Sequence, residues 1–206
     1  MLKLVLGRHC VKNFCLCEVS PLHEPNKSLL MLHATHSRII IRGSQVLFEK
    51  RASSGLFRKL LENEKKAMEI MEGINAPILV SVELNENLLT VSRAFLPGTT
   101  LHQTPKKSWP TVLRTLAENI KHSHARGLIH GDLKPSNIIV DGSRVTPIDW
   151  EHALPVGARL EDQPLRAFSP GTTDPRLIWA KGAVSGELDQ YSIERMLECS
   201  RLPTSS

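Results

Sequence analysis

The segment from residue 130 to residue 149 constrains the fold more than any other part of the chain. It reads HGDLKPSNIIVDGSRVTPID, so an apolar run at 138–140 is followed by an Asp-Gly pair and a second short run that ends at Ile148. An Asp-Gly pair between two such runs is typical of a β-hairpin. Because a hairpin brings its two ends together, we expect Asn137 and Asp149 to face the same site.

Three polar residues of this segment, Asp132, Asn137 and Asp149, match the needs of phosphoryl transfer. One Asp beside a substrate hydroxyl orients and deprotonates the nucleophile. An Asn/Asp pair holds Mg²⁺, which neutralises the charge on the phosphates. A polar turn with solvated acids explains any single one of these residues, but it does not explain the whole string at this spacing.

The string resembles the catalytic loop and metal-binding segment of the protein-kinase-like superfamily. The resemblance implies that Asp132 is the catalytic base, that Asn137 and Asp149 bind Mg²⁺, and that Lys134 steadies the γ-phosphate of ATP. Other family-like stretches lie within residues 38–200. They are a helix end at 120–127, a hinge at 95–101, the end of an activation segment at 171–175, and a helix start at 189–192 whose Asp189 braces the catalytic loop.

Hydrophobic patterning predicts the order β-β-β-α-β-β followed by a helix after Pro110. The expected strands are 29–34, 38–42, 45–50, 78–84 and 88–95, and the expected helix is 55–72. With the resemblance, this order predicts an α+β, bilobal protein-kinase-like fold with a five-stranded antiparallel N-lobe and a reduced helical C-lobe. The RIO kinases and the small protein kinase of the KEOPS complex are similar in having reduced C-lobes. The expected divisions are an irregular N-terminal segment at 1–27, an N-lobe at 28–97 and a truncated C-lobe at 98–206.

The resemblance also implies a nucleotide-anchoring lysine on a strand, paired with a glutamate on the following helix. Lys50 ends an expected strand, and Glu64 lies fourteen residues later. An ion pair between them aims the ammonium at the α- and β-phosphates. Glu62 is the neighbouring candidate, but it points about 200° away from Glu64 around the helix. The alternative is that Lys50 and Glu64 are ordinary surface charges.

Two departures from the family pattern concern nucleotide binding. No G-x-G-x-x-G motif lies between residues 20 and 45, so the turn over the phosphates is expected at 33–38, where the backbone can approach phosphates less closely. Phe48 lies two residues before Lys50 and shares its face of the strand. Kinases keep a small residue there, above the adenine, so Phe48 is expected to crowd the pocket.

Two further departures concern the catalytic segments. Gly131 stands where an Arg often precedes the catalytic Asp, so we expect any activity to be independent of an activation-loop phosphate. Asp-Trp-Glu at 149–151 replaces Asp-Phe-Gly and is similar to aminoglycoside and choline phosphotransferases. Glu151 is an additional candidate for a second metal site.

The function expected from these features is that of an ATP- and Mg²⁺-dependent serine/threonine protein kinase. Lys134-Pro135 and Gly171-Thr172 favour a protein Ser/Thr substrate, and Thr172 is expected to bond Asp132 and Lys134. An activating partner is also considered. The alternatives are a small-molecule kinase of the aminoglycoside/choline phosphotransferase type and a pseudokinase scaffold, which Phe48 and the missing glycine-rich loop would favour.

Composition excludes several other classes. The chain has 206 residues, and 26 Lys and Arg against 21 Asp and Glu give a net charge of +5. Because this charge is scattered and only 4% of residues are aromatic, nucleic acid is not indicated as a partner. No apolar run approaches the 18 or so residues of a membrane span, and Arg8 interrupts the N-terminal apolar stretch. We therefore expect no association with a membrane, and we expect a cytoplasmic location. The thiols Cys10, Cys15, Cys17 and Cys199 are then expected to be reduced, and the first three match no zinc-site spacing.

Overall fold

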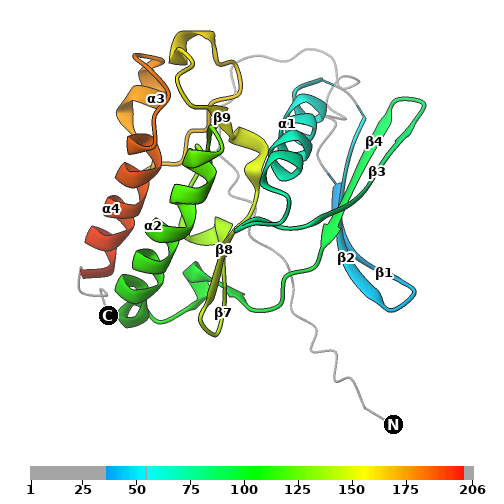
Figure 1. Cartoon of the computed structure of the whole chain (residues 1–206), viewed down its shortest axis with the longest axis horizontal. Helices are drawn as coiled ribbons and strands as arrows, with labels where there is room; N and C mark the ends of the chain where they lie inside the picture. The colour runs from blue at the N-terminus through cyan, green and yellow to red at the C-terminus, as the bar shows by residue number, and fades with distance from the viewer. Residues whose placement is uncertain (1–35, 54, 202–206) are drawn as a thin grey trace, which may run out of the picture. The chain divides into compact units, whose positions relative to one another are not determined.

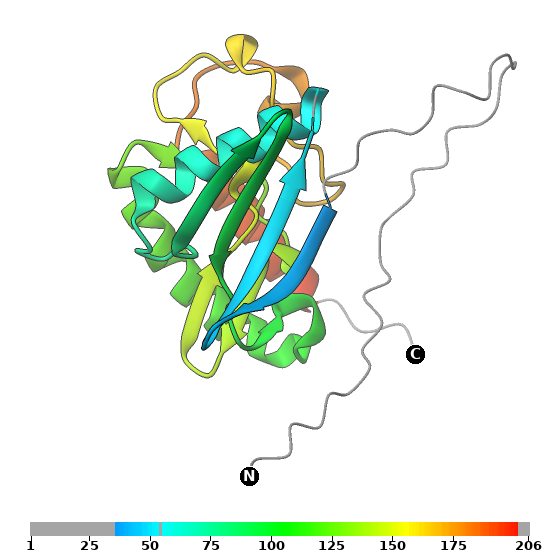
Figure 2. The same ribbon diagram turned by 90° about the vertical axis from the view of Figure 1, so that its right-hand side faces the viewer.

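The computed structural model of the chain describes residues 36–53 and 55–201. The first half of this part forms an antiparallel four-stranded sheet in the order β1-β2-β4-β3. Its strands are β1 (His36–Arg42), β2 (Gln45–Ala52), β3 (Leu79–Asn85) and β4 (Leu88–Ala94). Helix α1 (Gly55–Met71) runs across one face of this sheet, as Figures 1 and 2 show.

The sheet agrees with the sequence pattern at four of the five expected strands, with ends that differ by one or two residues. The fifth, expected at 29–34, lies outside the described residues. The phosphate-facing turn expected at 33–38 is wrong in its described part, because residues 36–38 belong to β1 and pair in register with residues 49–51 of β2. The backbone there is therefore engaged in the sheet and does not form a turn.

Helix α1 packs in two directions. Leu61 and Met68 face the sheet and contact its buried residues, namely Ala52, Leu89 and Val91. Ala67 and Met71 instead belong to a larger core that continues into the second half of the chain. Because one helix contributes to both cores, the position of α1 links the sheet to the helices that follow.

The second half consists of helices and short strands. The helices are α2 (Trp109–Ala125), α3 (Pro175–Trp179) and α4 (Glu187–Arg201), and the strands are β5 (Thr99–Thr100), β6 (Leu128–Ile129), β7 (Ile138–Asp141), β8 (Arg144–Pro147) and β9 (Leu154–Pro155). Single 3-10 turns are η1 (Leu101–Gln103), η2 (Lys106–Ser108), η3 (Pro135–Asn137), η4 (Trp150–His152) and η5 (Leu160–Asp162). Leu113, Leu116 and Trp150 are completely buried at the centre of the larger core.

The hairpin expected after residue 137 is confirmed. β7 and β8 pair from Ile138 opposite Pro147 to Asp141 opposite Arg144. The Ile148 amide donates to the Asn137 carbonyl at 2.8 Å, which closes the open end of the hairpin. The residues on either side of the hairpin, Asn137 and Asp149, are thereby held beside each other.

None of the helices within residues 36–53 and 55–201 combines the length and the hydropathy needed to cross a bilayer.

Gly98, in the segment between β4 and β5, is expected to tolerate no side chain. Its φ is +109°, and a Cβ there would lie 2.3 Å from the Val140 carbonyl oxygen. We predict that Gly98→Ala lowers the free energy of unfolding by about 3 kcal/mol, measured by urea denaturation. The matched control is Gly43→Ala, where φ is +62° and nothing lies within 4 Å of the added Cβ, so a loss of about 1 kcal/mol is expected. Equal losses at the two positions would show that the Val140 contact does not matter.

Glu49 generates a pH-dependent prediction. On β2 its carboxylate accepts from Arg38 Nε at 2.7 Å and lies 2.8 Å from Arg51 Nε. Burial raises the pKa of Glu49, but the two guanidinium groups outweigh burial and the net pKa is lowered. A lowered pKa contributes stability above the unfolded-state value, and that stability is lost as the pH falls through the folded-state value.

We therefore expect Glu49→Gln to cost about 1 kcal/mol at pH 7, since both arginines remain partly exposed to solvent. The difference from the unmutated chain should shrink below about pH 4, as followed by thermal unfolding at a series of pH values. Glu86→Gln, in the exposed turn between β3 and β4, is the control and should change little. A Glu49→Gln cost that is independent of pH would contradict the ionic explanation.

Candidate active site

The Lys50 ammonium lies at the centre of one half of the site. From β2 it forms an ion pair with Glu64 of α1, with 2.7 Å between Nζ and Oε2. It also contacts Asp149, directly after β8, and lies 3.6 Å from Oε2 of Glu151. Glu62, the other candidate on α1, instead pairs with Arg58 at the helix surface. Two separate segments, α1 and residues 149–151, thus bring acids to one nitrogen of β2.

The electrostatics of this cluster keep the ammonium charged. Burial lowers the pKa of Lys50, but the carboxylates of Glu64, Asp149 and Glu151 outweigh burial and raise it overall. Burial also raises the pKa of Asp149, but the adjacent ammonium outweighs that effect and the net pKa is lowered. The pKa of Glu151 is raised, first by burial and then by repulsion from Asp149.

These three acids also form the metal-binding candidate among the described residues. One carboxylate oxygen from each of Glu64, Asp149 and Glu151 lies within 4.8 Å of the others. The Lys50 ammonium contacts all three. Asp149 has a left-handed backbone with φ of 69°, a conformation that Asp tolerates better than most residues and that often occurs at functional sites.

The other half of the site is built around Asp132. Lys134 Nζ donates to one carboxylate oxygen at 2.6 Å, and the hydroxyl of Ser169 donates to the other at 2.6 Å. Lys134 also donates to the Ser169 oxygen at 3.2 Å, so the side chains of Asp132, Lys134 and Ser169 are all hydrogen-bonded to one another. The side-chain amide of Asn137 donates to the Asp132 backbone carbonyl at 3.1 Å. This hydrogen bond closes the loop from residue 132 to residue 137.

The expectation that Thr172 bonds Asp132 and Lys134 is wrong, because Ser169 makes both contacts. The Thr172 hydroxyl turns back to the carbonyl of Ser169 at 3.4 Å. The Thr173 hydroxyl accepts from the Ser169 amide at 2.7 Å, which fixes the loop with the serine pointing at the carboxylate. Ser169 lies three residues before Thr172, so the sequence offers both hydroxyls as candidates. Only the path of the loop determines which of them reaches Asp132.

The loop that carries Asp132 is held from behind by Asp189 of α4. The Asp189 carboxylate accepts from the backbone amides of His130 at 2.8 Å and Gly131 at 3.0 Å, and lies 2.9 Å from Nε2 of His124. Gly131 has φ of +77°, and a Cβ there would lie 2.4 Å from the His152 carbonyl oxygen. The backbone at position 131 therefore leaves no room for an arginine.

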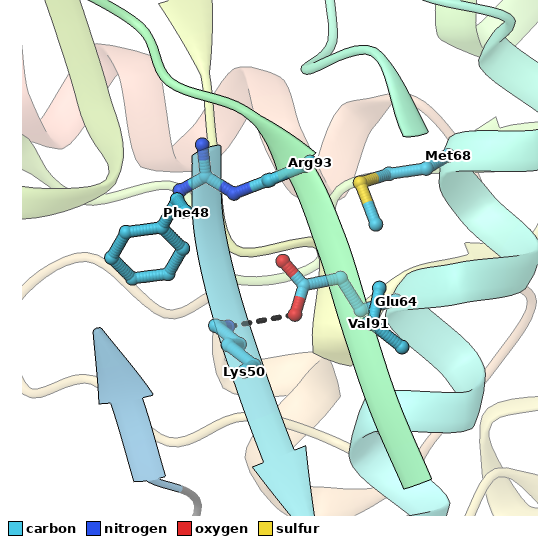
Figure 3. Close-up of a pocket in the computed structure, with 6 residues that line it drawn as sticks. All are labelled: Phe48, Lys50, Glu64, Met68, Val91 and Arg93. Carbon is cyan, nitrogen blue, oxygen red and sulfur yellow. Dashed lines mark hydrogen bonds and ion pairs between the residues drawn. The ribbon is translucent and has the colours of Figure 1, made fainter. Parts of the chain in front are cut away.

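Figure 3 shows the small hollow beside Lys50, which has no room for a water molecule. Its walls are formed by side chains from β2, α1 and β4, namely Phe48, Lys50, Glu64, Met68, Val91 and Arg93. The guanidinium carbon of Arg93 lies 4.3 Å from the centre of the Phe48 ring. Phe48 lies where it was expected, but Arg93 was missed, because a single cation in a strand gives no signal of its partner.

A carboxylate bonded by lysine and serine, beside a buried lysine–acid cluster on a sheet, defines a protein of the protein-kinase-like superfamily. Comparison with known families agrees with this class. The model of the RIO domain family matches residues 41–166, which include the Lys50 cluster and the Asp132 loop. The chain belongs to the RIO domain family, a family of atypical protein kinases.

Curated relatives are more distant. Serine/threonine-protein kinase D of Synechocystis sp. is 31% identical over 101 residues, which are 47% of this chain and 20% of that protein. Serine/threonine-protein kinase AfsK of Streptomyces coelicolor is 28% identical over 156 residues, which are 71% of this chain and 19% of that protein. The chain spans about a fifth of the length of these relatives. The similarity supports a kinase-like phosphotransferase.

We predict that Asp189→Asn loosens the Asp132 loop. Asp189 is 1% exposed, and replacing one of its oxygens by an amide N–H group turns a donor toward the backbone amide of His130 or Gly131 and leaves that buried N–H without an acceptor. The expected cost is about 2–3 kcal/mol of unfolding free energy. Hydrogen exchange at His130 and Gly131 should accelerate beyond that global change.

The control for this prediction is Asp141→Asn, at the exposed end of β7, which should leave both measurements unchanged. If the exchange at residues 130 and 131 followed only the global stability, Asp189 would not be a specific support of the loop.

Proposed function

We propose that this chain is an ATP- and Mg²⁺-dependent phosphotransferase with a bilobal kinase-like fold, and that it transfers the γ-phosphoryl group to a serine or threonine hydroxyl of a protein. The observation that carries the proposal is the Asp132 carboxylate. It already accepts a 2.6 Å hydrogen bond from a serine hydroxyl, with the Lys134 ammonium on its other oxygen. An acceptor hydroxyl in the same place would be oriented by the same carboxylate.

The residues divide into two roles. Lys50, fixed by Glu64, would hold the α- and β-phosphates of the nucleotide. Asn137 and Asp149 offer one amide oxygen and one carboxylate, the hard oxygen donors that suit Mg²⁺, and the closed hairpin holds them side by side. When bound there, Mg²⁺ would neutralise charge on the phosphates.

At the acceptor, Asp132 would receive the hydroxyl proton as the oxygen forms its bond to the γ-phosphorus. The bond from that phosphorus to the bridging oxygen breaks, and ADP leaves with the electron pair. Lys134, 2.6 Å from Asp132, would offset the negative charge of the transferring group. Ser169 would keep Asp132 oriented until the acceptor arrives, and an activating partner remains part of the proposal.

The pocket walls support a second candidate, a pseudokinase scaffold. Phe48 and Arg93 occupy the wall next to Lys50 and leave no room for a water molecule in the hollow. The Asp-Trp-Glu string at 149–151 supports a third, a small-molecule kinase. The acid and lysine positions needed for transfer are all present, and this favours an active enzyme over the scaffold.

The test is transfer from γ-labelled ATP with Mg²⁺, with and without a basic protein acceptor. We expect Asp132→Ala and Asp149→Ala to reduce labelling at least about 100-fold, because each removes a group needed for positioning or charge neutralisation. The control is Asp162→Ala, an exposed aspartate of η5 that should label like the unmutated chain.

Mapping the labelled residue tests Ser/Thr specificity. Transfer to aminoglycosides or choline with no transfer to protein would support the small-molecule kinase instead. Nucleotide binding without transfer to any acceptor would support the scaffold.

A further inference from the structure

The hydroxyl of Ser169 lies in the place where the proposed reaction needs its acceptor. It donates to Oδ1 of Asp132 at 2.6 Å, and its oxygen accepts from Nζ of Lys134 at 3.2 Å. Lys134 in turn donates to the other oxygen of the Asp132 carboxylate at 2.6 Å. The proposed base, the cation proposed to stabilise the transferring group and a serine hydroxyl are therefore already in contact with one another.

The loop around Ser169 holds this hydroxyl in place through its backbone. The Ser169 amide donates to the Thr173 hydroxyl at 2.7 Å, and the Ser169 carbonyl accepts from the amides of Thr172 at 3.2 Å and Thr173 at 3.1 Å. The hydroxyl of Ser192, a buried residue of α4, donates to the Thr172 carbonyl at 2.8 Å. The loop that carries Ser169 is thus tied to a helix.

Helix α4 positions the base and the hydroxyl together. Its Asp189 accepts from the two backbone amides directly before Asp132, and its Ser192 lies three residues later. Because residues three apart lie on the same side of a helix, one rigid element supports both the Asp132 loop and the Ser169 loop. Reactants held in such a geometry need no encounter between molecules, which raises the rate of their reaction. This arrangement favours transfer within one chain.

The other hydroxyls near Asp132 are directed elsewhere. The Thr172 hydroxyl turns to the Ser169 carbonyl at 3.4 Å, and the Ser136 hydroxyl donates to the Asn137 side chain at 3.4 Å. Ser169 is half-buried and lies between two exposed neighbours in the sequence, Phe168 and Pro170. Its oxygen is therefore on an accessible loop and not inside the core.

We propose that Ser169 is the site at which the chain phosphorylates itself, by transfer within one molecule. The inference rests on the proposed function and names a first acceptor for it. The Ser169 oxygen forms a bond to the γ-phosphorus of ATP while its proton passes to Asp132. The bond from that phosphorus to the bridging oxygen breaks, and ADP leaves with the electron pair. The phosphate on Ser169, with a charge of about −1.5 to −2, stays beside the Lys134 ammonium, which stabilises it.

The test is incubation of the purified full chain with Mg²⁺ and γ-labelled ATP, without any other acceptor, followed by mapping of the phosphorylated residue by mass spectrometry. We expect phosphoserine at position 169. Its first-order rate constant at saturating ATP should stay constant over an approximately 100-fold dilution of the protein, because both reactants belong to one molecule. Asp132→Ala should reduce this labelling at least about 100-fold.

Two variants of the loop separate an acceptor from a structural serine. Ser169→Thr keeps a hydroxyl at this position, so phosphothreonine should replace phosphoserine at residue 169. Thr172→Ala removes a hydroxyl of the same loop that does not reach Asp132, and it is the control. It should still form phosphoserine at position 169. The thermal unfolding midpoint of each variant shows whether it is folded.

The outcomes distinguish this inference from the proposed function. Transfer to the basic protein, or to another residue of the chain, with residue 169 unmodified would overturn the role of Ser169 and leave the phosphotransferase intact. A rate constant that rises in proportion to the protein concentration would overturn transfer within one molecule in the same way. No transfer to any serine or threonine, of this chain or of the basic protein, would overturn both.

Discussion

The ion pairs of Lys50 impose the main constraint on the arrangement of the site. A buried ammonium needs opposite charge close by, and here that charge comes from three places: Glu64 on α1 at 2.7 Å, Asp149 after β8, and Glu151 at 3.6 Å. Glu64 lies on the helix that follows β2, whereas Asp149 lies 99 residues after Lys50 in the sequence. Helix α1 can meet this demand because Met71 anchors it in the larger core. Displacing the helix would both break an apolar contact and separate Glu64 from the Lys50 ammonium.

The Asp132 loop depends on a second constraint, which acts on its backbone. Asp189, which reaches the loop from α4, accepts two consecutive amides, those of His130 and Gly131. On the other side the carboxylate of Asp132 is held by Ser169 and Lys134. The two halves of the site therefore carry opposite local charge patterns, with one cation among acids at Lys50 and one acid among donors at Asp132. Because the acids around Lys50 outnumber the cation, holding a polyphosphate there would also need the Mg²⁺ of the proposed function.

Sequence reasoning succeeded where the pattern is local. The hairpin after Asn137 was predictable because its turn and its apolar runs are contiguous. Glu64 was chosen on the family resemblance, and helical phase indicated that Glu62 points elsewhere. It failed where the answer depends on distant contacts. Ser169 takes the place expected of Thr172 because Thr173 fixes its amide, a detail of the loop path. The turn expected at 33–38 failed over 36–38 because an adjacent strand offered its backbone partners. Arg93 gave no sequence signal, since the strand register alone places it over Phe48.

Gly131 shows how the site can be ordered without an added phosphate. A side chain there would collide with the His152 carbonyl, so an arginine that receives a phosphate cannot occupy the position. The surrounding contacts supply the order instead. The ring of His130 lies 2.9 Å from the Ile148 carbonyl and packs against Trp150 at 4.7 Å between ring centres. Because Trp150 is completely buried and its indole N–H donates to the Pro147 carbonyl, the segment after Asp149 is fixed by packing. The Asp149 side chain is held toward Lys50 by the fold itself.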